Sequence, residues 1–327
     1  MTAKDTRIHS VEVIERKYAL NKPYVLSFDT IRSIVSIQLT MRLSDGRSVL
    51  TETVPLPGYS DETADSILAY LNRKKTVIAG KKAEDVRRDV AADIPVNPFA
   101  CSPVLTAIDL LSNDLYPQSG AVPMVTPATV EDTEGLKALL MKMEHNGGGT
   151  IKVKLSGKAR PDLNCVRELN STPFKATFIR FDANKAYTFD DAVRFYDALS
   201  EASFLKMVHY VEQPLAEADW TGHAALISRF NSVRTMLDES IVTENDLYRA
   251  TDIRVPYVKF KLFKQGGIKE LLNLANIAYS KGMKVVIGNG VATRISNDIE
   301  NWIYSSHPQL FFGASEANGF LKIAGNE

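Results

Sequence analysis

Cysteine is scarce in this sequence, and other marks of secreted, membrane-spanning or nucleic-acid-binding proteins are also missing. Cys101 and Cys165 are its only cysteines, which excludes a disulfide framework and a four-cysteine zinc site. No apolar run approaches the ~18 residues of a membrane span. The 39 basic and 39 acidic residues balance, so no surplus charge favours nucleic acid or anionic lipid. We therefore expect a cytoplasmic protein that binds a small molecule, with assembly into a homo-oligomer left open.

The first hundred residues have the pattern of a small α+β domain. Alternating apolar and polar residues predict strands over 7–19 and 33–43, and Asp45-Gly46 predicts a turn into a third strand over 48–54. Helical patterns follow over 61–71, 83–92 and 102–112. We expect residues 1–100 to form one domain ahead of the larger part of the chain.

From about residue 120 the sequence alternates between short β-rich runs and helix-like stretches. Eight strands are predicted, over 122–126, 150–155, 177–182, 208–212, 233–238, 257–262, 284–288 and 310–313. Helical patterns lie between them, for example over 131–144, 189–201 and 268–281. This alternation is typical of a (β/α)8-type barrel, which we predict for residues 101–327. The rival is a doubly wound open sheet, which would more often have fewer strands and a glycine-rich first turn.

Three successive predicted strands end in an acidic residue, namely Asp182, Glu212 and Asp238. Active sites of (β/α)8 barrels lie at the C-terminal ends of the strands, so these carboxylates are expected to converge. Buried carboxylates repel one another unless a cation lies between them. Oxygen ligands favour a hard ion such as Mg²⁺, with Mn²⁺ also suitable. The alternative is that each acid caps the following helix or pairs with a lysine.

Lysines occur in pairs within two of the predicted strands. Lys152 and Lys154 share one face of the second strand, and Lys259 and Lys261 share one face of the sixth, with apolar residues on the other face. Since apolar side chains face the helices around a barrel, the lysines are expected to face its interior. Burial lowers the pKa of a lysine toward the range of a general base. The alternatives are an exposed edge strand and simple salt bridges to the acids.

The predicted acids lie on one arc of the barrel, and the lysines lie on two opposite sides of it. This arrangement suits an enzyme that removes the proton next to a carboxylate. A divalent ion would stabilise the enediolate that forms, one lysine would take the proton, and another could return it.

The same residues resemble the enolase superfamily, in particular its muconate-lactonizing-enzyme subgroup. That subgroup includes muconate cycloisomerases, o-succinylbenzoate synthases, N-succinylamino acid racemases and dipeptide epimerases. The resemblance covers nearly the whole chain, and the N-terminal domain resembles the family's capping domain.

The resemblance implies a role for each motif. The acid/base residues would be Lys154, which is second in a K-x-K motif, and Lys261. The metal ligands would be Asp182, Glu212 and Asp238. Lys152 and Glu316 would contact the substrate, while Asn184 of a D-x-N motif and Glu239 would support the metal ligands from outside.

The expected activity is racemisation or epimerisation of an amino acid derivative or a dipeptide. Two alternatives stay open. The same lysines could serve a cycloisomerase or a syn-dehydratase of the o-succinylbenzoate synthase type, or the barrel could bind a carboxylate without catalysis. Loops around 20–30 and 55–62, together with the segment after the eighth strand, are expected to select the substrate.

Overall fold

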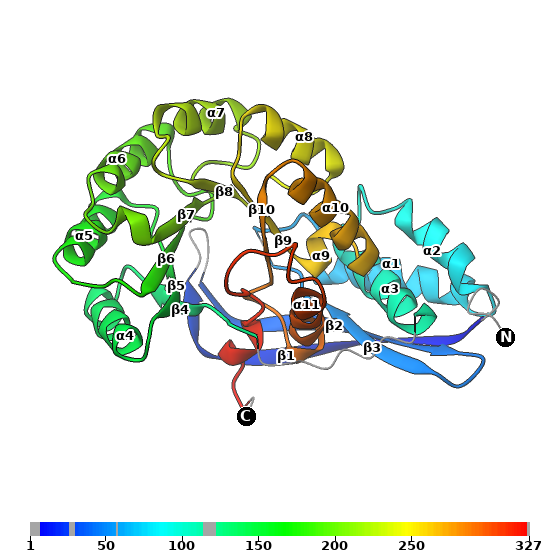
Figure 1. The fold of residues 1–327 in the computed structure, drawn as a ribbon. Coiled ribbons are helices and arrows are strands. Elements are labelled where there is room, and N and C mark those ends of the chain that lie inside the picture. Colours follow the sequence, from blue (N-terminus) through cyan, green and yellow to red (C-terminus); the bar gives the residue numbers. More distant parts are fainter. Residues whose placement is uncertain (1–6, 26–29, 57, 114–121, 326–327) are drawn as a thin grey trace.

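The N-terminal part of the chain is an antiparallel sheet with helices packed beside it (Figure 1). The computed structural model describes residues 7–25, 30–56, 58–113 and 122–325. The strands are ordered β1-β2-β3 and comprise β1 (Ile8–Val25), β2 (Thr30–Leu43) and β3 (Ser48–Thr53). The helices are α1 (Ala64–Ile78), α2 (Ala83–Ala91) and α3 (Pro98–Ser112). The predicted division at residue 100 falls inside α3, and it stays a prediction.

The rest of the chain forms a curled, parallel sheet with helices around its outside (Figure 1). In the described residues its strands are hydrogen-bonded in the order β10-β9-β8-β7-β6-β5-β4. They are β4 (Thr126–Thr129), β5 (Gly149–Lys154), β6 (Thr177–Asp182), β7 (Val208–Glu212), β8 (Thr235–Leu237), β9 (Tyr257–Phe260) and β10 (Lys284–Ile287). The helices are α4 (Thr133–His145), α5 (Ala159–Asn170), α6 (Phe189–Ser200), α7 (Trp220–Arg229), α8 (Glu244–Asp252), α9 (Leu262–Gln265), α10 (Ile268–Ser280) and α11 (Arg294–Ser306). This alternation confirms the predicted barrel-type fold with an N-terminal cap.

At the eighth position of the barrel, the described chain forms isolated bridges in place of a regular strand. Phe311 bridges β10, and Ser315 bridges the chain just before β4. The prediction of a regular strand over 310–313 was therefore wrong. The strand predicted over 122–126 was placed too early, because β4 begins at Thr126. Proline has no amide hydrogen, so Pro123 can only accept a hydrogen bond, which it does from Ser315 N at 2.7 Å.

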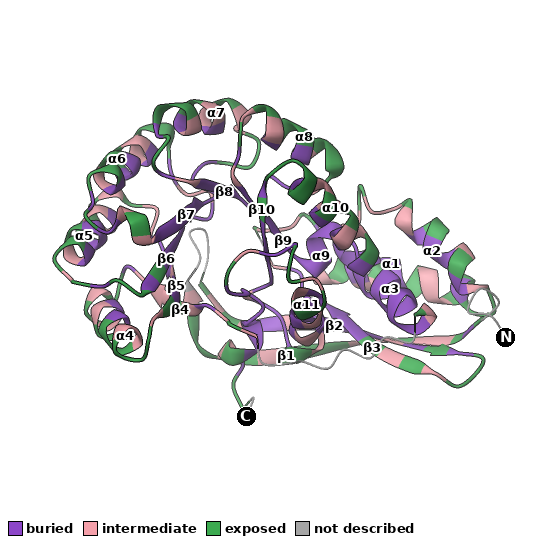
Figure 2. Cartoon of the chain, in the orientation of Figure 1, coloured by how far each residue is buried: buried purple, intermediate pink, exposed green. Residues whose placement is uncertain are grey.

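The pattern of buried and exposed residues differs between the strands and the helices. The barrel strands are mostly buried, whereas the surrounding helices turn exposed residues outward (Figure 2). Local caps set several helix starts. A capping box between Thr63 and Ser66 opens α1, and the Asp132 carboxylate accepts from Gly135 N at the start of α4. Among the residues that the structure describes, no helix is long and apolar enough to cross a membrane.

A buried carboxylate connects the N-terminal sheet to the barrel. Glu52 in β3 is 1 % exposed, and its Oε1 accepts from Thr293 N at 2.9 Å and from Ser296 N at 3.3 Å, at the start of α11. Its Oε2 accepts from Ser36 Oγ of β2 at 2.5 Å. A carboxylate at a helix N-terminus satisfies amides that the helix itself leaves unpaired. Glu52 therefore fixes the orientation of α11 against the cap.

We expect Glu52→Ala to lower the free energy of unfolding by about 2–3 kcal/mol, because buried amides at the start of α11 would lose their acceptor. Chemical denaturation followed by circular dichroism measures this. Glu15→Ala, at an exposed position of β1, is the matched control and should change stability by less than about 0.5 kcal/mol. Equal effects of the two substitutions would contradict the assigned role of Glu52.

Candidate active site

The predicted site residues meet at the C-terminal end of the parallel strands. Lys154, Asp182 and Glu212 are the last residues of β5, β6 and β7, and the ladder pairs Lys154 with Asp182 and Asp182 with Glu212. Asp238 directly follows β8, and Lys261 directly follows β9. Residues paired across parallel strands lie at one level, so the side chains converge as the sequence predicted.

A cavity of about 440 Å³ opens over these residues, and both parts of the chain line it. The barrel contributes Asp182, Glu212 and Asp238, while the cap contributes residues 21–24 of β1 and Tyr59, which follows β3. This volume is typical of small-molecule sites. Parts of both predicted specificity loops thus border the cavity, whereas residues 26–29 and 57 of these loops lie outside the described residues.

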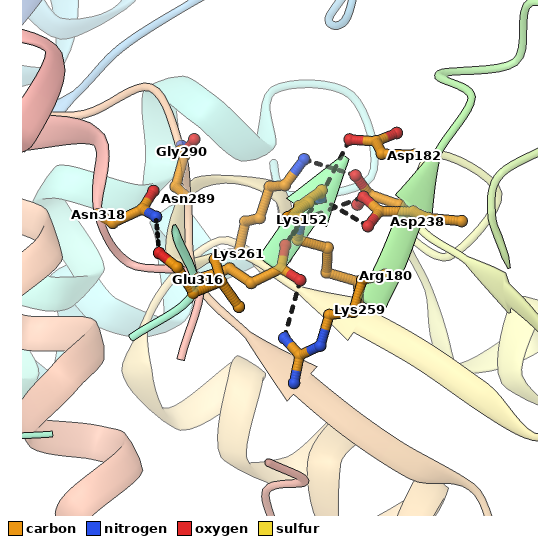
Figure 3. Close-up of polar contacts among 12 residues, drawn as sticks. Lys152, Arg180, Asp182, Asp238, Lys259, Lys261, Asn289, Gly290, Glu316 and Asn318 are labelled. Carbon is orange, nitrogen blue, oxygen red and sulfur yellow. Dashed lines mark hydrogen bonds and ion pairs between the residues drawn. The ribbon is translucent and has the colours of Figure 1, made fainter. Parts of the chain in front are cut away.

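Lysines from β5 and β9, which lie on either side of β7 in the sheet, meet at Glu212. Lys152 Nζ lies 2.6 Å from Glu212 Oε2 and 3.0 Å from Asp182 Oδ2, and Lys259 Nζ lies 3.1 Å from Glu212 Oε1. Lys154 Nζ lies 3.4 Å from Asp182 Oδ2, a longer and weaker contact. The lysines thus face the barrel interior, which confirms the orientation predicted from alternation; Figure 3 shows part of this cluster.

Asp238 is held by two lysines and a tyrosine. Lys261 Nζ donates to Asp238 Oδ2 at 2.6 Å, and Lys264 Nζ donates to Asp238 Oδ1 at 2.8 Å. Lys261 Nζ also donates to Tyr59 Oη at 2.7 Å, and this hydroxyl donates to Asp238 Oδ1 at 3.0 Å. A residue of the cap therefore contacts both a predicted catalytic lysine and a predicted metal ligand.

Glu316 is enclosed by cationic and phenolic groups and is 2 % exposed. Its Oε2 accepts from Lys152 Nζ at 2.7 Å and from Lys259 Nζ at 2.5 Å. Its Oε1 accepts from Arg180 Nη1 at 2.9 Å, a contact that Figure 3 shows, and from Tyr210 Oη at 2.8 Å. Both oxygens already bind protein groups, so the substrate contact predicted for Glu316 stays a prediction.

Burial and neighbouring charges shift the pKa values of Lys261 and Lys152 in opposite directions. Burial lowers the pKa of Lys261, and the charges of Lys259 and Lys264 reinforce this despite the opposing effect of Asp238. Burial would also lower the pKa of Lys152, but Asp182, Glu212 and Glu316 outweigh it and raise this pKa well above its ordinary value. A lysine with a lowered pKa is the better candidate for a base, so Lys261 suits proton transfer and Lys152 suits charge stabilisation.

The predicted metal ligands provide only oxygen atoms, which suits Mg²⁺. In the described part of the chain, no three His, Cys, Asp or Glu side chains are grouped so as to hold a metal ion. Lysine ammonium groups lie among the predicted ligands. Burial and the charge of Asp182 nevertheless raise the pKa of Glu212 to about 7. Asp182 is the opposite case, because burial raises its pKa but Lys152 and Lys154 outweigh this effect and lower the pKa to about 2. The donor set fits a divalent cation because all of its donor atoms are oxygens.

Asn184 and Glu239 lie beside the acids, as predicted for supporting residues. Asn184 Nδ2 donates to Glu239 Oε1 at 3.2 Å, and Asn184 N donates to Asp182 Oδ1 at 3.1 Å. Glu239 Oε2 is buried and finds no hydrogen-bond partner among the described residues. A buried carboxylate oxygen without a donor is costly, which is a further feature that favours an additional cation nearby.

Sequence reasoning did not identify several residues that complete the site. Arg180 and Tyr210 stand two residues before Asp182 and Glu212, so strand alternation places them on the same face and could have found them. Tyr59 lies in a loop, where no period gives its direction. Each predicted site residue does lie in this cluster, namely Lys152, Lys154, Asp182, Asn184, Glu212, Asp238, Glu239, Lys261 and Glu316.

Comparisons with known proteins agree with this geometry. A family model described as Enolase C-terminal domain-like matches residues 135–317, which is more than half of the chain. The chain belongs to the enolase superfamily. Its relatives and structural neighbours belong to the muconate-lactonizing-enzyme subgroup of that superfamily, which confirms the predicted resemblance.

Relatives of this enolase-superfamily chain include epimerases and racemases. An L-Lys-D/L-Arg epimerase of Methylococcus capsulatus is 25% identical over 315 residues, which span 89% of this chain and 84% of the relative. A dipeptide epimerase from Methylococcus capsulatus, solved with Mg and the dipeptide L-Arg-D-Lys, has a TM-score of 0.79 and 22% identity, covering 97% of this chain and 92% of that chain. An N-succinyl Arg/Lys racemase from Bacillus cereus has a TM-score of 0.85 and 19% identity, covering 97% and 89%.

These relatives confirm the predicted enzyme class, isomerase, for this member of the enolase superfamily. Structures of related dipeptide epimerases contain Mg and a dipeptide. Dependence of this chain on Mg²⁺ and the roles of its individual residues stay predictions.

Proposed function

We propose that this enolase-superfamily protein is a Mg²⁺-dependent racemase or epimerase that removes and returns the α-proton of a carboxylate substrate. The observation that carries the proposal is the position of Lys154 and Lys261. Lys154 ends β5 and Lys261 follows β9, with β6, β7 and β8 between these strands in the sheet. Both lysines line the cavity that holds the three acids. A substrate bound there would present its two faces to different lysines.

The two lysines are proposed to act as a base and an acid in turn. Lys261 is 8 % exposed and has a lowered pKa, so a neutral amine is within reach during turnover. Among the described residues, Lys154 Nζ makes one long ion pair, at 3.4 Å to Asp182 Oδ2, and can leave it without breaking a strong interaction. If one lysine removes the proton from one face and the other returns a proton to the opposite face, the configuration inverts.

Asp182, Glu212 and Asp238 are proposed to hold Mg²⁺. When bound, the ion would supply positive charge that stabilises the negative charge developing on the substrate carboxylate. Lys152 lies beside Asp182 and Glu212 and keeps its proton, so it is proposed to contact the substrate carboxylate. A dipeptide or an N-acylated amino acid would provide this carboxylate, consistent with the names of the relatives.

Exchange of the α-proton in D₂O tests the proposal. The full chain with Mg²⁺ is incubated with a library of dipeptides and N-acylamino acids, and ¹H NMR and chiral chromatography follow each compound. We expect at least one compound to lose its α-proton signal and to gain the opposite configuration. A chelator should stop both changes, and added Mg²⁺ should restore them.

Other outcomes separate the alternatives. A product that has lost water would indicate a dehydratase, and a product with rearranged bonds would indicate a cycloisomerase. Thermal stabilisation by Mg²⁺ without exchange in any compound would contradict the proposed activity and would support a non-catalytic carboxylate-binding barrel.

A further inference from the structure

One buried glutamine contacts the chain next to all three predicted metal ligands. Gln213 directly follows Glu212 at the end of β7 and is buried. Its backbone carbonyl accepts from Lys185 N at 2.7 Å, in the loop that follows Asp182 at the end of β6. Its side chain reaches the loop that begins with Asp238 at the end of β8. Gln213 therefore connects the C-terminal ends of three neighbouring strands.

The Gln213 side chain uses both atoms of its amide. Its Oε1 accepts from Asp238 N at 2.9 Å and from Ser240 N at 3.2 Å. Its Nε2 donates to Ser240 Oγ at 2.7 Å and to Leu215 O at 3.1 Å. Backbone amides only donate and backbone carbonyls only accept, so these partners fix the orientation of the side-chain amide. All four hydrogen-bonding positions of this amide are therefore used.

The backbone of these loops is strained at three positions. Gln213 has a φ of 37°, and Asn184 and Lys185, which follow β6, have φ values of 41° and 56°. Residues other than glycine adopt this left-handed region at a cost in free energy, and they keep it only where surrounding contacts hold them. The hydrogen bond from Lys185 N to Gln213 O and the four bonds of the Gln213 side chain are such contacts.

Pairing between β7 and β8 ends before it reaches Asp238. The two strands pair at only two positions, and the last pair joins Glu212 to Met236. Asp238 lies two residues beyond this pair, where its amide is bound by the Gln213 side chain. Mg²⁺ requires nearly ideal octahedral geometry, so its affinity depends on how accurately the ligands are spaced. The contact from Gln213 fixes the spacing of Asp238 from Glu212 where strand pairing has stopped.

We propose that Gln213 is a positioning residue for the divalent cation, because it holds the loops of Asp182 and Asp238 against the end of β7 and so sets the spacing of the three acids. Gln213 is completely buried, so it acts through these acids and takes no part in proton transfer. This inference rests on the proposed function, in which Asp182, Glu212 and Asp238 hold Mg²⁺.

Metal binding to the full chain, measured without substrate, tests the inference. Gln213→Met keeps much of the side-chain volume and removes the amide. Calorimetry gives the affinity for Mg²⁺, and the signal of free Mn²⁺ in electron paramagnetic resonance gives the affinity for Mn²⁺. We expect Gln213→Met to weaken binding of both ions about 10- to 100-fold, the usual effect of losing a group that orients metal ligands. Circular dichroism and chemical denaturation show whether the variant is folded.

Gln265→Met is the matched control. Gln265 is also a buried glutamine beside the site, and its Oε1 accepts from Lys261 N at 2.7 Å while its Nε2 donates to Ile241 O at 3.1 Å. The substitution leaves buried backbone groups without their partner, but neither group belongs to a proposed metal ligand. Gln265→Met should therefore lower stability and leave both metal affinities unchanged. An equal loss of affinity in the two variants would overturn the inference, because it would show an effect of stability alone.

A milder variant decides the question if Gln213→Met does not fold. Ser240→Ala removes the hydroxyl that accepts from Gln213 Nε2 and leaves the bond from Asp238 N in place. It should weaken binding of both ions about 2- to 10-fold, the effect of one lost hydrogen bond. Unchanged affinity in folded Gln213→Met, or in Ser240→Ala where Gln213→Met is unfolded, would overturn the inference and leave the proposed function intact. Failure of the unsubstituted protein to bind either ion would overturn the proposed function and this inference together.

Discussion

Replacing either Lys154 or Lys261 with methionine is expected to lower the rate of racemisation about 10²–10⁴-fold, the usual contribution of a general acid or base. Methionine keeps much of the side-chain volume and removes the amine. Lys154 and Lys261 line one cavity from β5 and from the end of β9, so each would serve one face of the substrate. Loss of one lysine should therefore block proton removal from one configuration and spare it in the other.

The decisive readout is exchange measured with the two enantiomers separately. In D₂O with Mg²⁺, each variant should exchange the α-proton of one enantiomer only, and the two variants should have opposite preferences. Lys137→Met, which removes a lysine that pairs with Glu134 and Glu168 on the helical layer, is the control and should exchange both enantiomers. Folded variants that both retain exchange with both enantiomers would contradict the roles of these lysines.

Glu316→Ala is expected to lower the free energy of unfolding by about 3–5 kcal/mol, because removing one partner of a buried ion pair leaves the other charge uncompensated. Glu316 is 2 % exposed and lies against Lys152, Lys259 and Arg180. Burial raises the pKa of Glu316, but these three cations outweigh it and hold the pKa well below the ordinary value of 4.5. The stability that this carboxylate contributes is therefore complete above pH 4.5 and is lost as the pH falls through the lowered pKa.

A double-mutant cycle identifies the cause of this loss. If repulsion among uncompensated cations destabilises Glu316→Ala, then adding Lys259→Met should recover stability, with a coupling energy of about 0.5–3 kcal/mol. Denaturation at pH 7 gives all four values. Glu217→Ala removes an exposed acid that pairs with Lys185 at 3.1 Å, and this control should cost less than about 1 kcal/mol. A cycle with no coupling would show that Glu316 acts by packing alone.

The parts of the site that could be predicted lie on strands, where successive side chains alternate between two faces. Alternation placed Lys152 and Lys154 on one face, and the ends of β6 and β7 placed Asp182 and Glu212 at one level. The eighth barrel position was harder, because single bridges involve only one residue on each side and leave no alternating run.

Residues that reach the site from loops could not be predicted. Tyr59 follows β3 and approaches Lys261 across 202 positions of sequence, and Lys322 lies in a short 3₁₀ helix. The directions of these side chains depend on tertiary packing between the cap and the barrel. Glu52 is a further example, since its acceptor role depends on α11, which begins far along the chain at Arg294.

A crystal structure with Mg²⁺ and a slowly reacting substrate analogue tests the central claim most directly. The account predicts one ion at about 2.0–2.1 Å from oxygens of Asp182, Glu212 and Asp238, the distance usual for Mg²⁺. It also predicts that the α-carbon of the analogue lies between Lys154 Nζ and Lys261 Nζ. An ion bound elsewhere, or both amines on the same side of the α-carbon, would contradict it.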